Sequence, residues 1–454
     1  MMDVPPWMYE WQDPALLAEP PAAIVCPMKY DKRWAYSVEL DDNPVSAFTV
    51  TRPLLAAHAW TDAPPGVPGG TRHPFVGNVA LIVCWIGGGN STWLTWDHLR
   101  TLEEEGWGLI NHGYWSAGNH WDPASFLPPE QLRRELYWAQ QVLADNLHPG
   151  TGVPEFVYPS GDWHYRPYLE EYGIRSASGG RDLTRNLLAE KADFFFIRRN
   201  NLDSKGWGPT EPVMKHFPTP PAAGDLVVDF THNMGADPAA TNVLRWRERL
   251  ETIEKTWGAG GSDELWCART VDVLDYVRAA RAARVDVTPG RLTVQADPGL
   301  PAAGLTIRLE PVSEQAVLPE VPGGKVYRQG QKVWITTPPL GGPSLPPVPE
   351  PRLERIYQGP ATNYLEWGRL RSVAGLSFAC SGGAPSNDYQ QSIQLQTPEG
   401  AREMVTSGHP ASPGRWGVWN LYWNLPDRPA IPATGLEVSL HRNMRLMEVW
   451  VLKE

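Results

Sequence analysis

Two adjacent carboxylates, Asp41 and Asp42, follow the apolar run from Trp34 to Leu40. The run reads as a buried strand, and the Asp-Asp-Asn-Pro sequence after it is typical of a turn. At the end of a strand, the two carboxylates of such a pair can have different chemical roles. One carboxylate can hold a divalent cation while the other takes a proton from the water that this cation polarises. The alternative is a solvated turn, because aspartate, asparagine and proline are ordinary turn residues.

Polar clusters also follow three later strand-like runs: Asn111-His112, the turn from Tyr158 to Asp162, and Thr231-His232-Asn233. In a parallel α/β barrel, the carboxyl ends of the strands meet on one face, and active sites lie there. We therefore expect these clusters to meet Asp41 and Asp42 in space. Each cluster alone says little, because a histidine after a strand is often structural; the four together indicate a site.

Strand-like and helix-like stretches alternate from about residue 23 to residue 285, which predicts a mostly parallel α/β sheet, closed or open. The expected strands are 23–25, 34–40, 79–86, 108–110, 155–158, 194–197 and 226–230. The expected helices are 96–105, 128–147, 164–172, 240–257 and 270–283. The stretch 47–77 is rich in proline and glycine and predicts a loop excursion over one mouth of the fold.

After about residue 287, helical spacing disappears and short β runs take its place. A dense proline and glycine stretch then separates these runs from a last hundred residues in which alternating runs indicate a β-sandwich. The predicted organisation is an N-terminal extension (1–22), a β/α barrel (23–285), a small β-rich segment (286–337), a linker (338–352) and a β-sandwich that could bind carbohydrate (353–454).

Composition narrows the classes of partner. The 454 residues carry a net charge of −11, which argues against nucleic acid. No apolar run approaches the roughly 20 residues that span a membrane. The first residues lack the features of a secretory signal, so we expect a cytoplasmic protein, or an extracellular or cell-envelope one if a leader has been removed. The 22 tryptophans favour a carbohydrate ligand, because flat aromatic faces stack on sugar rings.

The order of these motifs resembles the polysaccharide deacetylases (carbohydrate esterase family 4, NodB homology domain). The resemblance covers roughly residues 23–285 and implies a distorted parallel (β/α) barrel that acts as a metal-dependent hydrolase on N-acetyl or O-acetyl groups of a glycan. It is carried by Val38-Glu39-Leu40-Asp41-Asp42, Gly108-Leu109-Ile110-Asn111-His112, Phe156-Val157-Tyr158-Pro159-Ser160-Gly161, Phe230-Thr231-His232, and the run Leu265 to Thr270 before the last helix.

The resemblance implies that Asp41 is the catalytic base, and that Asp42 and His112 are metal ligands. The family places its second metal histidine four residues later, where this chain has Ser116. His120 lies four residues further on, and we favour it because imidazole is the better zinc ligand. The expected cofactor is a divalent cation, Zn²⁺ above others, with room left for water.

The resemblance also implies that His232 is the general acid, and that the Ser160 amide stabilises the oxyanion from the turn Tyr158-Pro159-Ser160-Gly161. Here the chain departs from the family, because serine replaces the usual aromatic residue and the arginine expected before the proline is missing.

Three arginines are candidates to replace the missing one: Arg166, Arg175 and Arg198. For the family's fourth motif the chain offers only Asp203 and Trp207. Tyr158 and Pro159 are candidate substrate contacts, and four tryptophans near these loops could line a sugar groove or simply pack: Trp115, Trp121, Trp163 and Trp207.

Two other functions remain open. The same fold could open a small cyclic amide, which the altered motif allows. A barrel without catalysis could instead accompany a carbohydrate-binding C-terminal domain, whose best aromatic candidates are Trp416, Trp419, Tyr422 and Trp423. The expected partner is an acetylated glycan.

Overall fold

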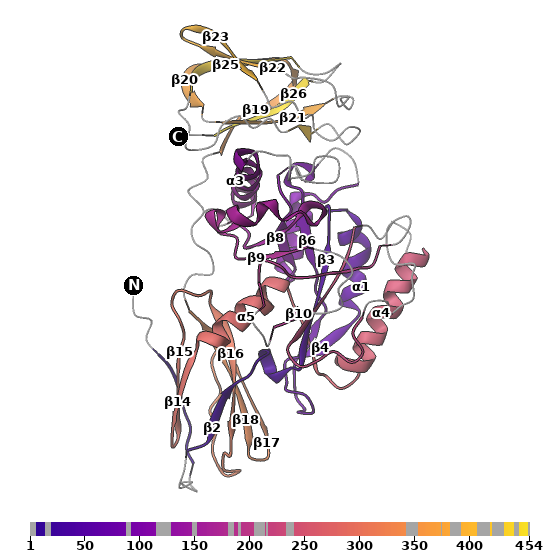
Figure 1. Cartoon of the computed structure of the whole chain (residues 1–454), viewed down its shortest axis with the longest axis vertical. Helices are drawn as coiled ribbons and strands as arrows, with labels where there is room; N and C mark the ends of the chain where they lie inside the picture. The colour runs from indigo at the N-terminus through magenta and orange to yellow at the C-terminus, as the bar shows by residue number, and fades with distance from the viewer. Residues whose placement is uncertain are drawn as a thin grey trace.

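The computed structural model shows a curled parallel sheet with helices, antiparallel sheets at one end of it and a β-sandwich at the other (Figure 1). It describes residues 6–13, 20–87, 92–114, 129–147, 152–179, 186–188, 192–203, 214, 217–232, 240–341, 353–373, 375–381, 392–405, 418–419, 431–439 and 445–452. Within those residues, no helix is both long and apolar enough to cross a bilayer.

The central sheet is the mostly parallel sheet that the alternation of strands and helices predicted, curled into a half-barrel as the resemblance implied. Its nine strands run in the order β10-β12-β3-β6-β7-β8-β9, with β11 on β12 and β13 on β3. From β12 to β9 all neighbours are parallel. Every residue of β3 and β12 is buried, as expected for strands covered on both faces. The strands are β3 (Trp34–Leu40), β6 (Asn78–Leu81), β7 (Gly108–Asn111), β8 (Glu155–Val157), β9 (Ser176–Ser178), β10 (Asn186–Leu187), β11 (Asn200–Asn201), β12 (Asp225–Thr231) and β13 (Leu265–Cys267).

A short extended segment joins the two ends of the curled sheet. Ile197 forms a parallel bridge with Ser178 of β9, and β11 then pairs in parallel with β12. The strand expected at 194–197 is therefore wrong, apart from this one bridge. Its apolar side chains pack against other side chains, with Phe195 against Arg166 and Phe196 against Trp163. The strand that pairs with β8 is instead β9, whose short Ser-Ala-Ser sequence gives no strand signal.

The expected helices form at nearly the predicted bounds: α2 (Trp96–Glu104), α3 (Pro129–Asn146), η6 (Trp163–Tyr172), α4 (Thr241–Trp257) and α5 (Thr270–Ala282). Thr95 and His98 cap α2 reciprocally, each side chain accepting the other's backbone N–H. The segment η6 is a 3₁₀-helix because Pro167 interrupts any α-helical ladder, and it ends at the left-handed Gly173.

The stretch 47–77 is more regular than a loop. It contains a π-helical turn η2 (Ala47–Thr51), the helix α1 (Arg52–Ala56) and a hairpin of β4 (Ala59–Thr61) and β5 (Arg72–Pro74). The strand expected at 79–86 is shorter than predicted, because after β6 the chain turns into the 3₁₀-helix η3 (Val83–Trp85).

Two antiparallel sheets lie at the end of the barrel opposite the sandwich (Figure 1). The strand expected at 23–25 forms, but as β2 it pairs with β16 in one of these sheets and not in the parallel sheet. The boundaries of the domains stay a prediction. One sheet contains β1 (Trp7–Glu10), β15 (Arg291–Gln295) and β14 (Arg284–Thr288); the other contains β17 (Lys325–Gln329), β18 (Lys332–Leu340), β16 (Ala303–Glu310) and β2 (Ala22–Val25).

The C-terminal part is the predicted β-sandwich, with two four-stranded antiparallel sheets. Strand β19 lies against helix α3 of the barrel (Figure 1). Of the aromatic candidates for carbohydrate binding, Trp416, Tyr422 and Trp423 lie outside the described residues. The sheets are β19 (Leu353–Thr362), β26 (Arg445–Leu452), β21 (Gly375–Ser381) and β24 (Val418–Trp419), and β20 (Tyr364–Val373), β25 (Ile431–Ser439), β22 (Ser392–Thr397) and β23 (Gly400–Val405).

A buried ion pair fastens α4 to the parallel sheet. Arg249 donates to both carboxylate oxygens of Asp229 on β12, each at 2.7 Å. The Tyr36 hydroxyl donates to the same carboxylate at 2.7 Å, and the Asn200 amide at 3.0 Å. One carboxylate thus connects β3, β11, β12 and α4, and every lone-pair direction of a costly buried charge is used.

Replacing Arg249 by Met should lower the free energy of unfolding by about 3–5 kcal/mol, because Asp229 would keep a buried charge without its main partner. Urea denaturation measures this loss. Arg245→Met is the matched control on the same helix, since the Arg245–Glu248 pair is exposed, and it should cost less than about 0.5 kcal/mol. Equal losses in the two variants would contradict the role given to Asp229.

Candidate active site

The two aspartates stand on a constrained turn at the carboxyl end of β3. The Asp41 N–H donates to the Thr231 carbonyl at 3.1 Å. Asp42 and Asn43 have left-handed backbones, with φ of 67° and 38°. Buried Asn43 holds this turn against β6, because its N–H donates to the Ala80 carbonyl at 3.2 Å and its side-chain oxygen accepts from Ile82 at 3.0 Å. Left-handed non-glycine residues persist where the surroundings enforce them, and they cluster at functional sites.

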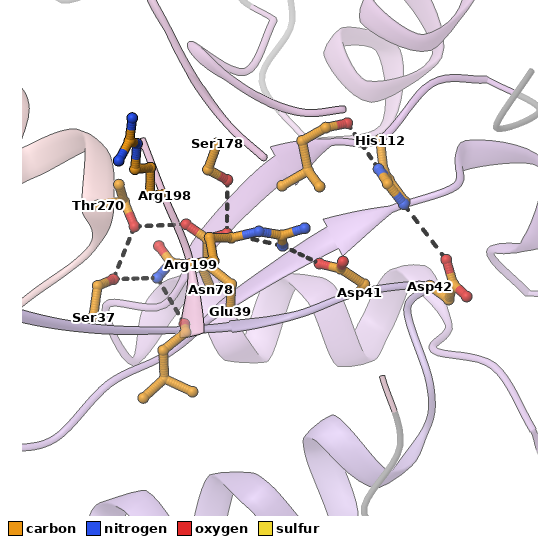
Figure 2. Close-up of polar contacts among 12 residues, drawn as sticks. Ser37, Glu39, Asp41, Asp42, Asn78, His112, Ser178, Arg198, Arg199 and Thr270 are labelled. Atoms are coloured by element: carbon orange, nitrogen blue, oxygen red, sulfur yellow. Dashed lines mark hydrogen bonds and ion pairs between the residues drawn. The ribbon is translucent and has the colours of Figure 1, made fainter. Parts of the chain in front are cut away.

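His112, directly after β7, faces Asp42. Its Nδ1 donates to the Val157 carbonyl at 2.8 Å, because a carbonyl can only accept (Figure 2). Its Nε2 lies 3.5 Å from Asp42 Oδ1, and the two side chains are 5% and 22% exposed. The hydrogen bond to Val157 therefore fixes both the tautomer and the direction of the ring.

This pair fits a divalent cation. In the neutral imidazole, Nε2 is an acceptor, so two acceptors face each other at 3.5 Å, longer than an ordinary N–H···O hydrogen bond. Two tetrahedral zinc ligands at about 2.0–2.2 Å from the ion lie about 3.3–3.6 Å apart. Within the described residues, no group of three or more His, Cys, Asp or Glu could hold a metal. Both candidates for the third ligand, His120 and Ser116, lie outside those residues.

Arg199 is the arginine that contacts Asp41. Its Nη1 donates to Asp41 Oδ1 at 2.7 Å and to Glu39 Oε2 at 3.2 Å, and its guanidinium lies 4.0 Å from the centre of the Phe230 ring. Burial alone would raise the pKa of the Asp41 carboxyl. The charge of Arg199, together with that of His232 and the hydrogen bond from Arg199, instead holds this pKa below its ordinary value.

None of the three arginines proposed from the sequence takes this place. Arg166 stacks on Phe195, and Arg175 pairs with Asp275. Arg198 is exposed and its guanidinium points away from Asp41 (Figure 2). Sequence reasoning missed Arg199 by one position. The available signal was the alternation of an extended segment, in which adjacent side chains point to opposite faces.

His232 and Asp203 form the second charged pair of the site. Asp203 accepts from His232 Nδ1, and it also accepts from the Thr231 hydroxyl at 2.6 Å. Burial favours the neutral imidazole. The hydrogen bond to Asp203 and the charges of Asp41 and Asp42 outweigh burial and raise the pKa of His232 to about 9. The imidazolium therefore persists at neutral pH, and its proton is lost only as the pH rises through about 9.

The turn after β8 places Ser160 at the surface with a left-handed backbone, φ 53°. Gly161 and Asp162 donate the hydrogen bonds that close this turn, so the Ser160 amide is not used in them. Tyr158 and Pro159 are buried, and their role as substrate contacts stays a prediction.

One of the four candidate tryptophans is described and accessible. Trp163 is 38% exposed and stacks on Tyr158 at 5.5 Å between ring centres. Trp115, Trp121 and Trp207 lie outside the described residues. Of the four candidates, Trp163 is therefore the one whose described surface a sugar could contact, on the part that Tyr158 and Phe196 leave exposed.

No protein-family model and no curated protein matches the chain. Among solved structures, the Streptococcus pyogenes deacetylase PplD in complex with acetate is 14% identical over 42% of this chain and 86% of its own, with a TM-score of 0.29. A Mycobacterium smegmatis protein proposed to be a polysaccharide deacetylase is 14% identical over 58% and 96%, with a TM-score of 0.33. A Bacteroides ovatus protein proposed to be an α-L-fucosidase is 8% identical over 91% and 93%, with a TM-score of 0.27. The similarity to deacetylases is distant, and function has to be argued from the site.

The approach of His112 Nε2 to Asp42 Oδ1 predicts that these two side chains bind the metal. His112→Ala and Asp42→Ala should each abolish stoichiometric zinc binding, because each removes a ligand atom from a site with few of them. Elemental analysis after dialysis measures the bound metal. His164→Ala removes an exposed histidine and should leave the stoichiometry unchanged. Full zinc binding by the His112→Ala variant would contradict the assignment.

The Asp203 contact predicts the titration of His232. In the metal-free protein the His232 ring should titrate near pH 9, and Asp203→Asn should move the midpoint down toward the ordinary value of 6.5. Imidazole carbon NMR chemical shifts against pH report the midpoint. Asp162→Asn removes the partner of His164 and should leave His232 unaffected. An unchanged midpoint in the Asp203→Asn variant would show that other charges hold the proton.

Proposed function

We propose that the barrel hydrolyses acetyl groups, N-linked or O-linked, on a glycan, with a divalent cation held by Asp42, His112 and a third ligand at position 120 or 116. The observation that carries this proposal is the approach of His112 Nε2 to Asp42 Oδ1 beside the buried carboxylate of Asp41. Zinc suits a site of one carboxylate and imidazole nitrogens. When bound, the cation would lower the pKa of a water molecule and polarise the acyl oxygen.

Asp41 supplies the base. Arg199 occupies one of its oxygens, Oδ1, which leaves Oδ2 to take the proton from the attacking water. The hydrogen bond also fixes the plane of the carboxylate, so the base meets the water in one orientation. A pKa held low by Arg199 keeps Asp41 ionised in the resting site.

His232 supplies the acid. Because Asp203 engages Nδ1, the proton on Nε2 is the one that can pass to the departing amine or alkoxide. Its pKa of about 9 keeps this proton on the ring at neutral pH. The Ser160 amide, left out of its own turn, is our candidate for a hydrogen bond to the developing oxyanion.

Asp41→Asn should keep the fold, the bound metal and the contact with Arg199, because the asparagine carbonyl can still accept. It should lower kcat for acetate release from an acetylated oligosaccharide by about 10²–10⁴-fold, since it removes the base. Asp286→Asn, at an exposed position on β14, should retain full activity. Undiminished turnover by the Asp41→Asn variant would overturn the mechanism.

The substrate class is tested by product analysis. The wild-type protein is incubated with a panel of acetylated oligosaccharides and, in parallel, with small cyclic amides. Acetate from the glycans supports the proposal. Ring-opened product from the amides alone would assign the same site to an amidohydrolase. Zinc binding without either product would leave a metal-binding protein and reject the deacetylase.

A further inference from the structure

Glu39 is a fully buried carboxylate inside the barrel, two residues before Asp41. Its Oε2 accepts from Ser178 on β9 at 2.7 Å and from Arg199 at 3.2 Å. Its Oε1 accepts from Thr270, at the start of α5, at 2.9 Å. Figure 2 shows the Arg199 side chain between Glu39 and Asp41, with the Thr270 hydroxyl on the opposite side of Glu39 and the Ser178 hydroxyl directed at the Glu39 oxygen that also meets Arg199.

The network continues away from the site. Thr270 and Ser37 share a hydrogen bond between their hydroxyls at 2.9 Å. The Asn78 amide donates to Ser37 at 2.9 Å and to the Val38 carbonyl at 2.9 Å. Three strands and one helix therefore fix the position of a single carboxylate, and such outer contacts orient the groups that they support.

One nitrogen of Arg199, Nη1, donates hydrogen bonds to the carboxylates of both Glu39 and Asp41. A guanidinium is planar and its donors keep fixed directions, so the contact with Glu39 limits where the same nitrogen can meet Asp41. Without Glu39, the long arginine side chain keeps the charge attraction to Asp41 but loses the second point that defines its orientation.

We propose that Glu39 is a positioning residue for the hydrolysis, acting through Arg199 on the orientation of Asp41. The inference rests on the proposed function, because it assumes that Asp41 is the base. The positioning role differs from a purely structural role, in which Glu39 would only fill the interior of the barrel. Apolar replacement of a buried ionic group is often neutral for stability, so stability alone does not separate the two roles.

Steady-state kinetics on the full chain test the proposal with four variants. Glu39→Leu should lower kcat by about 10–100-fold, the usual effect of losing an outer contact, with KM and zinc content unchanged. Glu39→Gln should recover most of the activity, because its carbonyl can accept from Arg199. Adding Glu39→Leu to Arg199→Met should cost nothing further, since both act through one contact. The proposal would be overturned if the losses of kcat in the two single variants multiply in the double variant. An unchanged kcat in Glu39→Leu would overturn it as well.

Glu155→Leu is the matched control, because Glu155 is also a buried carboxylate of the barrel, on β8, and no described hydrogen bond joins it to Arg199. Its kcat should equal that of the wild type. If Glu39→Leu fails to fold, Ser178→Ala combined with Thr270→Val loosens Glu39 without removing it, and should lower kcat in the same direction. Unchanged kcat in that double variant would equally overturn the proposal.

Crystal structures provide a result that needs no turnover. In the Glu39→Leu variant, Arg199 Nη1 should leave the 2.7 Å contact with Asp41 Oδ1, whereas in Glu39→Gln it should remain. If the wild-type protein releases no acetate but Arg199 moves in this way, the proposed function fails and the positioning of Arg199 stands. If acetate is released and Arg199 keeps its contact without Glu39, the function stands and the positioning role fails.

Discussion

The hydrogen bond from His112 Nδ1 to the Val157 carbonyl joins the ends of two neighbouring strands and decides what the imidazole can do. With Nδ1 committed, only Nε2 is left to face Asp42. Each of the other charged groups also has a dedicated partner. Arg199 serves Asp41 and Asp203 serves His232. Asp41, His232 and the facing Asp42 and His112 atoms are thus each oriented by a hydrogen bond or ion pair within one small region.

Closure of the barrel is what brings Arg199 to Asp41. The segment 197–201 leaves β9 at Ile197 and reaches β12 through β11, so that alternate side chains point into the barrel and away from it. Asn200, next to Arg199, donates to the same Asp229 carboxylate that Arg249 of α4 binds. The network that stabilises the fold and the network that orients the Asp41 carboxylate therefore share this short segment.

Much of the frame could be predicted from the sequence. The strand 34–40, the helix α2 and the approach of Asp42 to His112 all follow from sequence signals, namely apolar runs, the alternation of strand-like and helix-like stretches, and polar clusters at strand ends. Arg199 could not be predicted in the same way, because its position depends on the bridge between Ile197 and Ser178. The short strand β9 has too few apolar residues to signal itself, and β2 carries no local sign of its antiparallel partner.

The proposed function requires that Asp42 and His112 share one cation. Anomalous diffraction from a crystal of the wild-type protein grown with zinc, collected on both sides of the zinc absorption edge, locates that cation. We expect one strong peak about 2.0–2.2 Å from both Asp42 Oδ1 and His112 Nε2. The same map would show whether residue 120 or 116 completes the site. A peak elsewhere, with Asp42 and His112 in direct contact and no ion between them, would contradict the claim.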